Sequence, residues 1–83
     1  MQGGGQANAP THRLDVRGFR CPIPVGETRQ ALDGLERGHV LEVRFDDPEA
    51  LEDLPPMLAR HGHKMLSIEE IAGDWRMCIE VMM

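Results

Sequence analysis

The 83-residue chain lacks several features that whole classes of protein require. No apolar run approaches the roughly 20 residues that a membrane-spanning helix needs, so we expect no membrane association of that kind. The N-terminal residues Met1 to Gln6 contain no charged region followed by an apolar one, which argues against a secretory signal. Only two cysteines are present, and in a chain without a signal they are expected to be free thiols. These absences together predict a cytoplasmic protein.

Positive charge is also scarce, with 9 basic against 14 acidic residues and a net charge of −5. Direct nucleic-acid binding usually requires a basic face, so a protein partner is the better expectation. A chain this short forms one domain and buries only about 60% of its unfolded surface. We therefore expect its chemistry near the surface, at a loop or a helix end.

Apolar periodicity predicts the secondary structure. Residues 1–11 are rich in Gly, Gln and Ala and are expected to form a flexible N-terminal tail ahead of one domain at 12–83. Alternating or helical spacing predicts strands at 13–17, 40–45, 64–71 and 75–81, and a first helix at about 24–35. Because proline is tolerated only near a helix start, Pro55 and Pro56 predict a short turn at 48–52, then a helix capped by Asp53 and ending near Arg60.

This β-α-β-α-β-β order predicts a two-layer α/β sandwich. The first two strands, joined through a helix, should be parallel, and the last two should form an antiparallel hairpin. Each strand has one apolar face, so both helices are expected on one face of a four-stranded mixed sheet. We expect a core that includes Leu14, Val16, Leu32, Leu35, Leu41, Val43, Leu58, Met77 and Ile79.

Cys21 is the strongest candidate for chemistry, because it lies just ahead of the first helix. Pro22 stiffens the loop and Pro24 suits the first helical position. The N–H groups of Val25 and Gly26 would then lack helical partners and favour an anion. With Arg17 and Arg20 nearby in sequence, these surroundings predict a lowered thiol pKa. The alternative is a buried structural cysteine beside a turn.

The run from Leu14 through Val25, which contains Gly18-Phe19-Arg20-Cys21-Pro22-Ile23-Pro24, resembles the TusA-like, or SirA-like, sulfurtransferases. The resemblance continues through Arg29, Gly38, Asp46-Asp47-Pro48, Asp53-Leu54-Pro55 and His63, and so covers about 14–81. It implies the sandwich fold and a motif cysteine, here Cys21, that accepts sulfane sulfur as a persulfide. It also implies a sulfur-donor protein (a cysteine desulfurase or a rhodanese-like protein), an acceptor protein, and no bound cofactor.

Two positions depart from well-known members of that family that act in tRNA thiolation. Ile23 replaces an acidic residue between the two prolines, and Glu52 replaces an arginine. Both positions are candidate partner contacts. Arg29, on the first helix near the motif, is either another partner contact or a solvated residue of the helix face. The relay could serve tRNA thiolation, sulfur oxidation or cofactor synthesis. A non-enzymatic regulatory or adaptor module of the same fold is the alternative function.

The other candidate residues favour structural roles. Cys78 is expected on a sheet face with Arg76 and Glu80, as a small side chain rather than a second sulfur site. Asp46 and Asp47 are typical of turn and capping groups rather than an acid/base pair. His39, His61 and His63 have no cysteine or carboxylate at ligand spacing, so we expect no metal site.

Overall fold

The computed structural model describes residues 9–83 and has the predicted order of elements. The strands are β1 (His12–Asp15), β2 (Val40–Phe45), β3 (Lys64–Ile71) and β4 (Asp74–Glu80), and the helices are α1 (Ile23–Asp33) and α2 (Pro48–His61). Most of the predicted N-terminal tail, 1–11, lies outside the described residues. At its end, the Thr11 backbone N–H donates a hydrogen bond to the carbonyl oxygen of Val40 at 2.8 Å.

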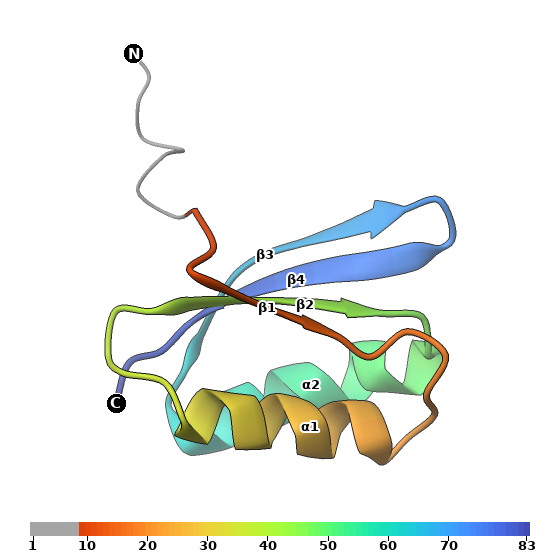
Figure 1. Ribbon diagram of the computed structural model, residues 1–83. Coiled ribbons are helices and arrows are strands. Elements are labelled where there is room, and N and C mark those ends of the chain that lie inside the picture. The colour runs from red at the N-terminus through yellow and green to blue at the C-terminus, as the bar shows by residue number, and fades with distance from the viewer. Residues whose placement is uncertain (1–8) are drawn as a thin grey trace.

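The strands form one mixed sheet in the order β1-β2-β4-β3. β1 pairs with β2 in parallel, and β4 pairs antiparallel with both β2 and β3. Figure 1 shows α1 and α2 side by side on one face of this sheet, and within residues 9–83 no helix covers the opposite face. The predicted α/β sandwich with both helices on one face is therefore confirmed.

The core lies between the sheet and the helices. Leu41, Val43 and Phe45 alternate along β2 toward the helices and are buried, and Met77 and Ile79 of β4 lie beside them. The helices contribute buried side chains such as Leu32, Leu54 and Leu58. Of the predicted core, Leu14 and Leu35 are only half-buried, because β1 is an edge strand and Leu35 lies beyond the end of α1.

The second helix corrects the sequence-based expectation. α2 runs without interruption from Pro48, so the predicted turn at 48–52 and the predicted cap at Asp53 are wrong. Asp47 is the N-cap, and Pro55 and Pro56 lie inside the helix. Each proline removes one backbone hydrogen bond, but burial of Leu54, Met57 and Leu58 holds the helix on the sheet. Tertiary packing here outweighs the local preference of proline.

Other boundaries differ by little. β2 and β3 have the predicted bounds, whereas β1 ends at Asp15 and α1 ends at Asp33. Gly34 follows α1, and its N–H donates to the carbonyl of Ala31. Within residues 9–83, neither helix combines the length and apolarity that crossing a bilayer requires.

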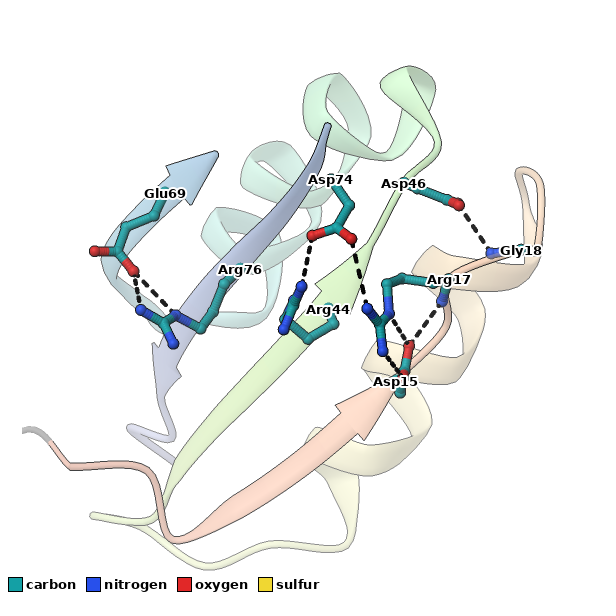
Figure 2. Close-up of polar contacts among 8 residues, drawn as sticks. All are labelled: Asp15, Arg17, Gly18, Arg44, Asp46, Glu69, Asp74 and Arg76. Carbon is teal, nitrogen blue, oxygen red and sulfur yellow. Dashed lines mark hydrogen bonds and ion pairs between the residues drawn. The ribbon is translucent and has the colours of Figure 1, made fainter. Parts of the chain in front are cut away.

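The helix-free face of the sheet carries a network of charged side chains (Figure 2). Asp74 accepts one hydrogen bond from Arg44 at 2.7 Å and forms an ion pair with Arg17 at 3.5 Å. On the neighbouring strands, Arg76 donates to Glu69 at 2.9 Å through Nε. Glu69 and Arg76 are direct cross-strand partners, whereas Arg44 is opposite Arg76 and pairs instead with Asp74, farther along β4. Such cross-strand pairs of opposite charge contribute to the stability of the sheet.

Candidate functional site

Cys21 lies in the loop between β1 and α1 and is half-buried. Its backbone N–H donates a hydrogen bond to Oδ2 of Asp47 at 2.7 Å. Its thiol donates to Oδ2 of Asp53 on α2, with 3.3 Å between Sγ and the oxygen. The Cys21–Pro22 peptide bond is cis, and Pro22 is the N-cap of α1. Both ends of the residue, backbone and side chain, are thus fixed by carboxylates from the second half of the fold.

The turn after β2 holds the loop that contains the cysteine. Asp47 is almost completely buried, and its Oδ1 accepts the N–H of Glu49 at the start of α2. Asp46 accepts the N–H of Gly18 at 2.9 Å, where Gly18 has a φ of 89° that favours glycine. The capping role predicted for Asp47 is confirmed. Its contact with Cys21 was missed, although parallel strands whose carboxyl ends meet at one edge could have suggested it.

The electrostatic surroundings of Cys21 correct the prediction of an activated thiol. Its pKa is raised to about 11, first by desolvation of the half-buried thiol, then by the hydrogen bond to Asp53 and by the charges of Asp53, Asp47 and Glu49. Nearby negative charge disfavours the thiolate. The expected lowering of the pKa is wrong for the unpartnered protein, and Cys21 is a protonated thiol at neutral pH.

The two arginines that were expected to add positive charge point elsewhere. Arg17 binds both carboxylate oxygens of Asp15, at 3.0 and 2.7 Å, on the helix-free side of the sheet (Figure 2). Arg20 is paired with Asp46 at 3.4 Å. Their charge is therefore balanced by neighbouring carboxylates, and acidic groups dominate the field at Cys21.

The start of α1 also differs from expectation in its hydrogen bonding. α1 begins at Ile23, so the buried Pro24 is at the second helical position rather than the first. The N–H of Gly26 is not free, because it donates to the carbonyl of Pro22 at 3.0 Å. The N–H of Ile23 donates to the carbonyl of Arg20. The predicted pair of free donors at Val25 and Gly26 is therefore wrong for Gly26.

A groove of about 470 Å³ opens between the two helices, with Cys21 at one end. Both helices contribute to its lining, which consists of Cys21, Pro22, Val25, Gly26, Arg29, Asp53, Pro56, Met57, Arg60 and His61. Of the candidate partner contacts, Arg29 lines this groove, whereas Ile23 and Glu52 are exposed outside it. Sequence reasoning missed the contributions of Asp53, Arg60 and His61 because they come from a different helix.

Two exposed apolar side chains flank the cysteine in sequence. Phe19 is 50% exposed and Ile23 is 47% exposed. Sequence reasoning gave Phe19 no separate role, although the residue is part of the motif run. Exposed apolar side chains that lie together in one patch are typical of a surface that another protein covers.

Cys21, Asp47 and Glu49 bring one sulfur and two carboxylate oxygens within 4.8 Å of one another. Both oxygens of Asp47 already accept backbone N–H bonds, which fits a structural cap better than a metal ligand. His63 and His39 accept backbone N–H bonds through their Nδ1 atoms, from Met82 and Glu36 respectively.

Cys78 lies where strand alternation predicts, on the helix-free face of the sheet. It is opposite Glu42 on β2 and Ser67 on β3 and is half-buried. The helix layer lies on the other face, together with the groove, so Cys78 and Cys21 are on opposite sides of the sheet.

Comparison with known proteins agrees with this architecture. The family model described as "Sulfurtransferase TusA" matches residues 12–81. A "Putative sulfur carrier protein" of Thermotoga maritima is 42% identical over 72 residues, covering 86% of this chain and 91% of its own length. "Putative sulfur carrier protein YedF" of Escherichia coli K12 is 36% identical over 71 residues, covering 86% of this chain and 92% of its own.

A solved structure shares the fold. The crystal structure of a SirA-like protein from Desulfitobacterium hafniense superimposes with a TM-score of 0.76 at 26% sequence identity, covering 88% of this chain and 100% of that one. The family match, the two relatives and the fold extend over nearly all described residues, and the motif cysteine lies within the matched range. The chain therefore belongs to the TusA family of sulfurtransferases, a family of sulfur carriers.

Proposed function

We propose that this protein carries sulfur as a persulfide on Cys21, taking it from a donor protein and passing it to an acceptor protein. The observation that carries the proposal is the placement of Cys21 in the lining of the groove between the helices. A thiol in this position is within reach of a partner's sulfur, while Asp47 fixes its backbone. The site needs no bound cofactor for this chemistry.

The transfer step is a displacement at sulfane sulfur. The Cys21 thiolate attacks the outer sulfur of a donor persulfide, R–S–SH. A new S–S bond forms, the old S–S bond breaks, and the donor leaves as a thiolate, R–S⁻. The same exchange in reverse roles passes the sulfur to an acceptor thiolate. No oxidant or reductant is consumed.

The raised pKa of Cys21 makes the rate of loading depend on the partner. With the pKa of Cys21 at about 11, only about one thiol in a thousand is ionised at pH 8. A donor that supplies a base, or positive charge facing Asp47, Glu49 and Asp53, would favour the thiolate upon docking. The isolated carrier should therefore react slowly, which protects its thiol from adventitious oxidation.

The exposed apolar pair Phe19 and Ile23 supports docking by a protein. A cysteine desulfurase or a rhodanese-like protein is the proposed donor class, because both form protein persulfides. Ile23 and Glu52, which replace charged residues of well-known relatives, are proposed to select the donor and the acceptor.

A radiolabel relay tests this function. A cysteine desulfurase with [³⁵S]cysteine should transfer label to the carrier, seen on a non-reducing gel and lost after treatment with dithiothreitol. Cys21→Ser should take up no label, whereas Cys78→Ser should be labelled like the wild type. Label that stays on the desulfurase with the wild-type carrier would favour the regulatory or adaptor alternative.

A further inference from the structure

The basic side chains at the far end of the groove have no assigned role. Among residues 9–83, every ion pair made by an arginine involves Arg13, Arg17, Arg20, Arg44 or Arg76. The remaining arginines are Arg29, Arg37 and Arg60, and two of these three line the groove. In a chain with 14 acidic residues, two arginines without a carboxylate partner in one groove indicate a place for an external anion.

Each helix contributes one face to the lining of the groove. On α2, Asp53, Met57 and Arg60 recur at helical spacing along one face, and on α1 Val25 and Arg29 do the same. Arg60 is seven positions after Asp53, and at a rise of 1.5 Å per residue this is about 10 Å along the helix. One end of the groove thus holds the thiol beside acidic groups, and the other end, about 10 Å away, holds the arginines.

This difference in charge between the two ends of the groove indicates where a ligand's anionic group would lie. An anionic group close to the reacting sulfur would be repelled by Asp53, Asp47 and Glu49, whereas a carboxylate farther along would meet Arg29 and Arg60. Since an extended peptide spans about 3.3–3.6 Å per residue, about 10 Å corresponds to about three residues. Side chains on a helix lean toward its N-terminus, so Arg60 can reach back toward the thiol and meet a carboxylate one or two residues from the sulfur. Between the two ends, the apolar lining of Pro22, Val25, Pro56 and Met57 can contact the ligand's backbone and methylene groups.

We propose that the groove binds a low-molecular-weight peptide persulfide, with its carboxylate at Arg29 and Arg60 and its outer sulfur at Cys21. A volume of about 470 Å³ falls within the range of sites for small molecules. The inference rests on the proposed function for the transfer step, which is the displacement given above with a peptide thiolate as the leaving group. It adds a second class of donor, which reacts without a partner protein through the small ionised fraction of Cys21 and therefore loads it more slowly than a docked donor protein.

Binding can be tested without any sulfur transfer. S-methylglutathione, which has carboxylates but no transferable sulfur, is titrated into ¹⁵N-labelled protein. We expect chemical-shift changes at the groove residues Val25, Gly26 and Met57, with much weaker binding to the Arg29→Ala/Arg60→Ala double variant. No groove shifts at millimolar ligand would overturn the inference and leave the persulfide function standing.

Transfer is tested with two donors that differ in charge. Glutathione persulfide has carboxylates, and N-acetylcysteamine persulfide has none. The loading rate of Cys21 from glutathione persulfide should fall roughly tenfold in the double alanine variant, since each partly exposed ion pair contributes a few-fold. Loading from the neutral donor should not change. An equal loss for both donors, or no loss for either, would contradict the assignment.

Two control variants exclude a structural explanation. Arg37→Ala removes the third arginine without an ion pair, which is exposed and lies outside the groove lining, and should load like the wild type from both donors. Arg29→Lys/Arg60→Lys retains both charges and should restore most of the rate with glutathione persulfide. If inorganic polysulfide fails to load Cys21 at all, the proposed function fails, while the titration still decides the groove.

Discussion

Oδ2 of Asp53 lies 3.3 Å from the Sγ atom of Cys21 and accepts its thiol proton. The two residues are 32 positions apart: Cys21 lies in the loop before α1, and Asp53 lies in α2. The bond stabilises the protonated form, so the carrier's resting state is a slowly reacting thiol that a docked partner can activate. Reactivity in this protein is therefore controlled by α2 as well as by the motif loop.

Removing the Asp53 charge should increase the reactivity of Cys21. In a Cys78→Ser background, where Cys21 is the one thiol, Asp53→Asn should lower the pKa of Cys21 from about 11 toward the ordinary value of about 8.5. Alkylation by iodoacetamide, measured from pH 7 to 11, should shift its midpoint downward and be about tenfold faster at pH 8. Glu52→Gln is the matched control, because it removes a neighbouring exposed charge that does not contact the thiol. An unchanged midpoint in Asp53→Asn would show that Asp53 does not control the thiol.

Asp47→Ala should destabilise the fold. The buried carboxylate accepts the N–H of Cys21 and the N–H of Glu49, and both donors would lose their partner. Loss of an N-cap and of a buried hydrogen bond costs about 1–3 kcal/mol in the free energy of unfolding, measured by urea denaturation. Glu52→Ala, at an exposed position of the same helix, should change it by no more than about 0.5 kcal/mol. Equal stabilities for the two variants would contradict the assigned role of Asp47.

Stability at acid pH should depend on Asp15. Its hydrogen bonds from Arg17 lower the carboxyl pKa to about 2, below the unfolded value of about 3.9. A lowered pKa adds stability that is present above the unfolded pKa and is lost as the pH falls toward 2. Because both side chains are well exposed, the effect should stay below about 1 kcal/mol. Asp15→Asn should be less stable than the wild type at pH 6, with the gap closing by pH 2. A stability difference between the two proteins that grows at low pH would contradict this prediction.

Cys78→Ser should change stability by at most about 1 kcal/mol. Cys78 is half-buried on the helix-free face, opposite Glu42 and Ser67, where a hydroxyl can find polar neighbours. Thermal unfolding of Cys78→Ser and Cys21→Ser beside the wild type measures the effect. A loss above about 3 kcal/mol would show that Cys78 packs as a core residue.

The sequence predicted the fold well because its signals are local. Alternation in β2 and β4 identifies the buried face directly, as the burial of Val43 and Met77 shows. The start of α2 was wrong because Pro55 and Pro56 oppose a helix locally, while the packing of Leu54 and Leu58 that outweighs them depends on the assembled sheet. A short stretch of sequence does not show this packing, because it depends on residues far apart in the chain.

The site was only partly predictable for the same reason. The motif identified Cys21, but the desolvation that contributes most to its raised pKa depends on the packed fold. The carboxylates that raise the pKa further, Asp53 and Asp47, lie 32 and 26 residues away. Arg17 and Arg20 are closer in sequence, yet their side chains pair with Asp15 and Asp46. Sequence proximity therefore gave the wrong sign for the field at the thiol.

The central claim is that sulfur is carried on Cys21, and mass spectrometry of the sulfur-loaded protein tests it most directly. After incubation with a donor and trapping with iodoacetamide, the peptide containing Cys21 should gain about 32 Da beyond simple alkylation, the mass of one sulfur atom. The gain should disappear after reduction, and Cys21→Ser should show none anywhere in the chain. A persulfide found on Cys78, with the peptide containing Cys21 unmodified, would contradict the account.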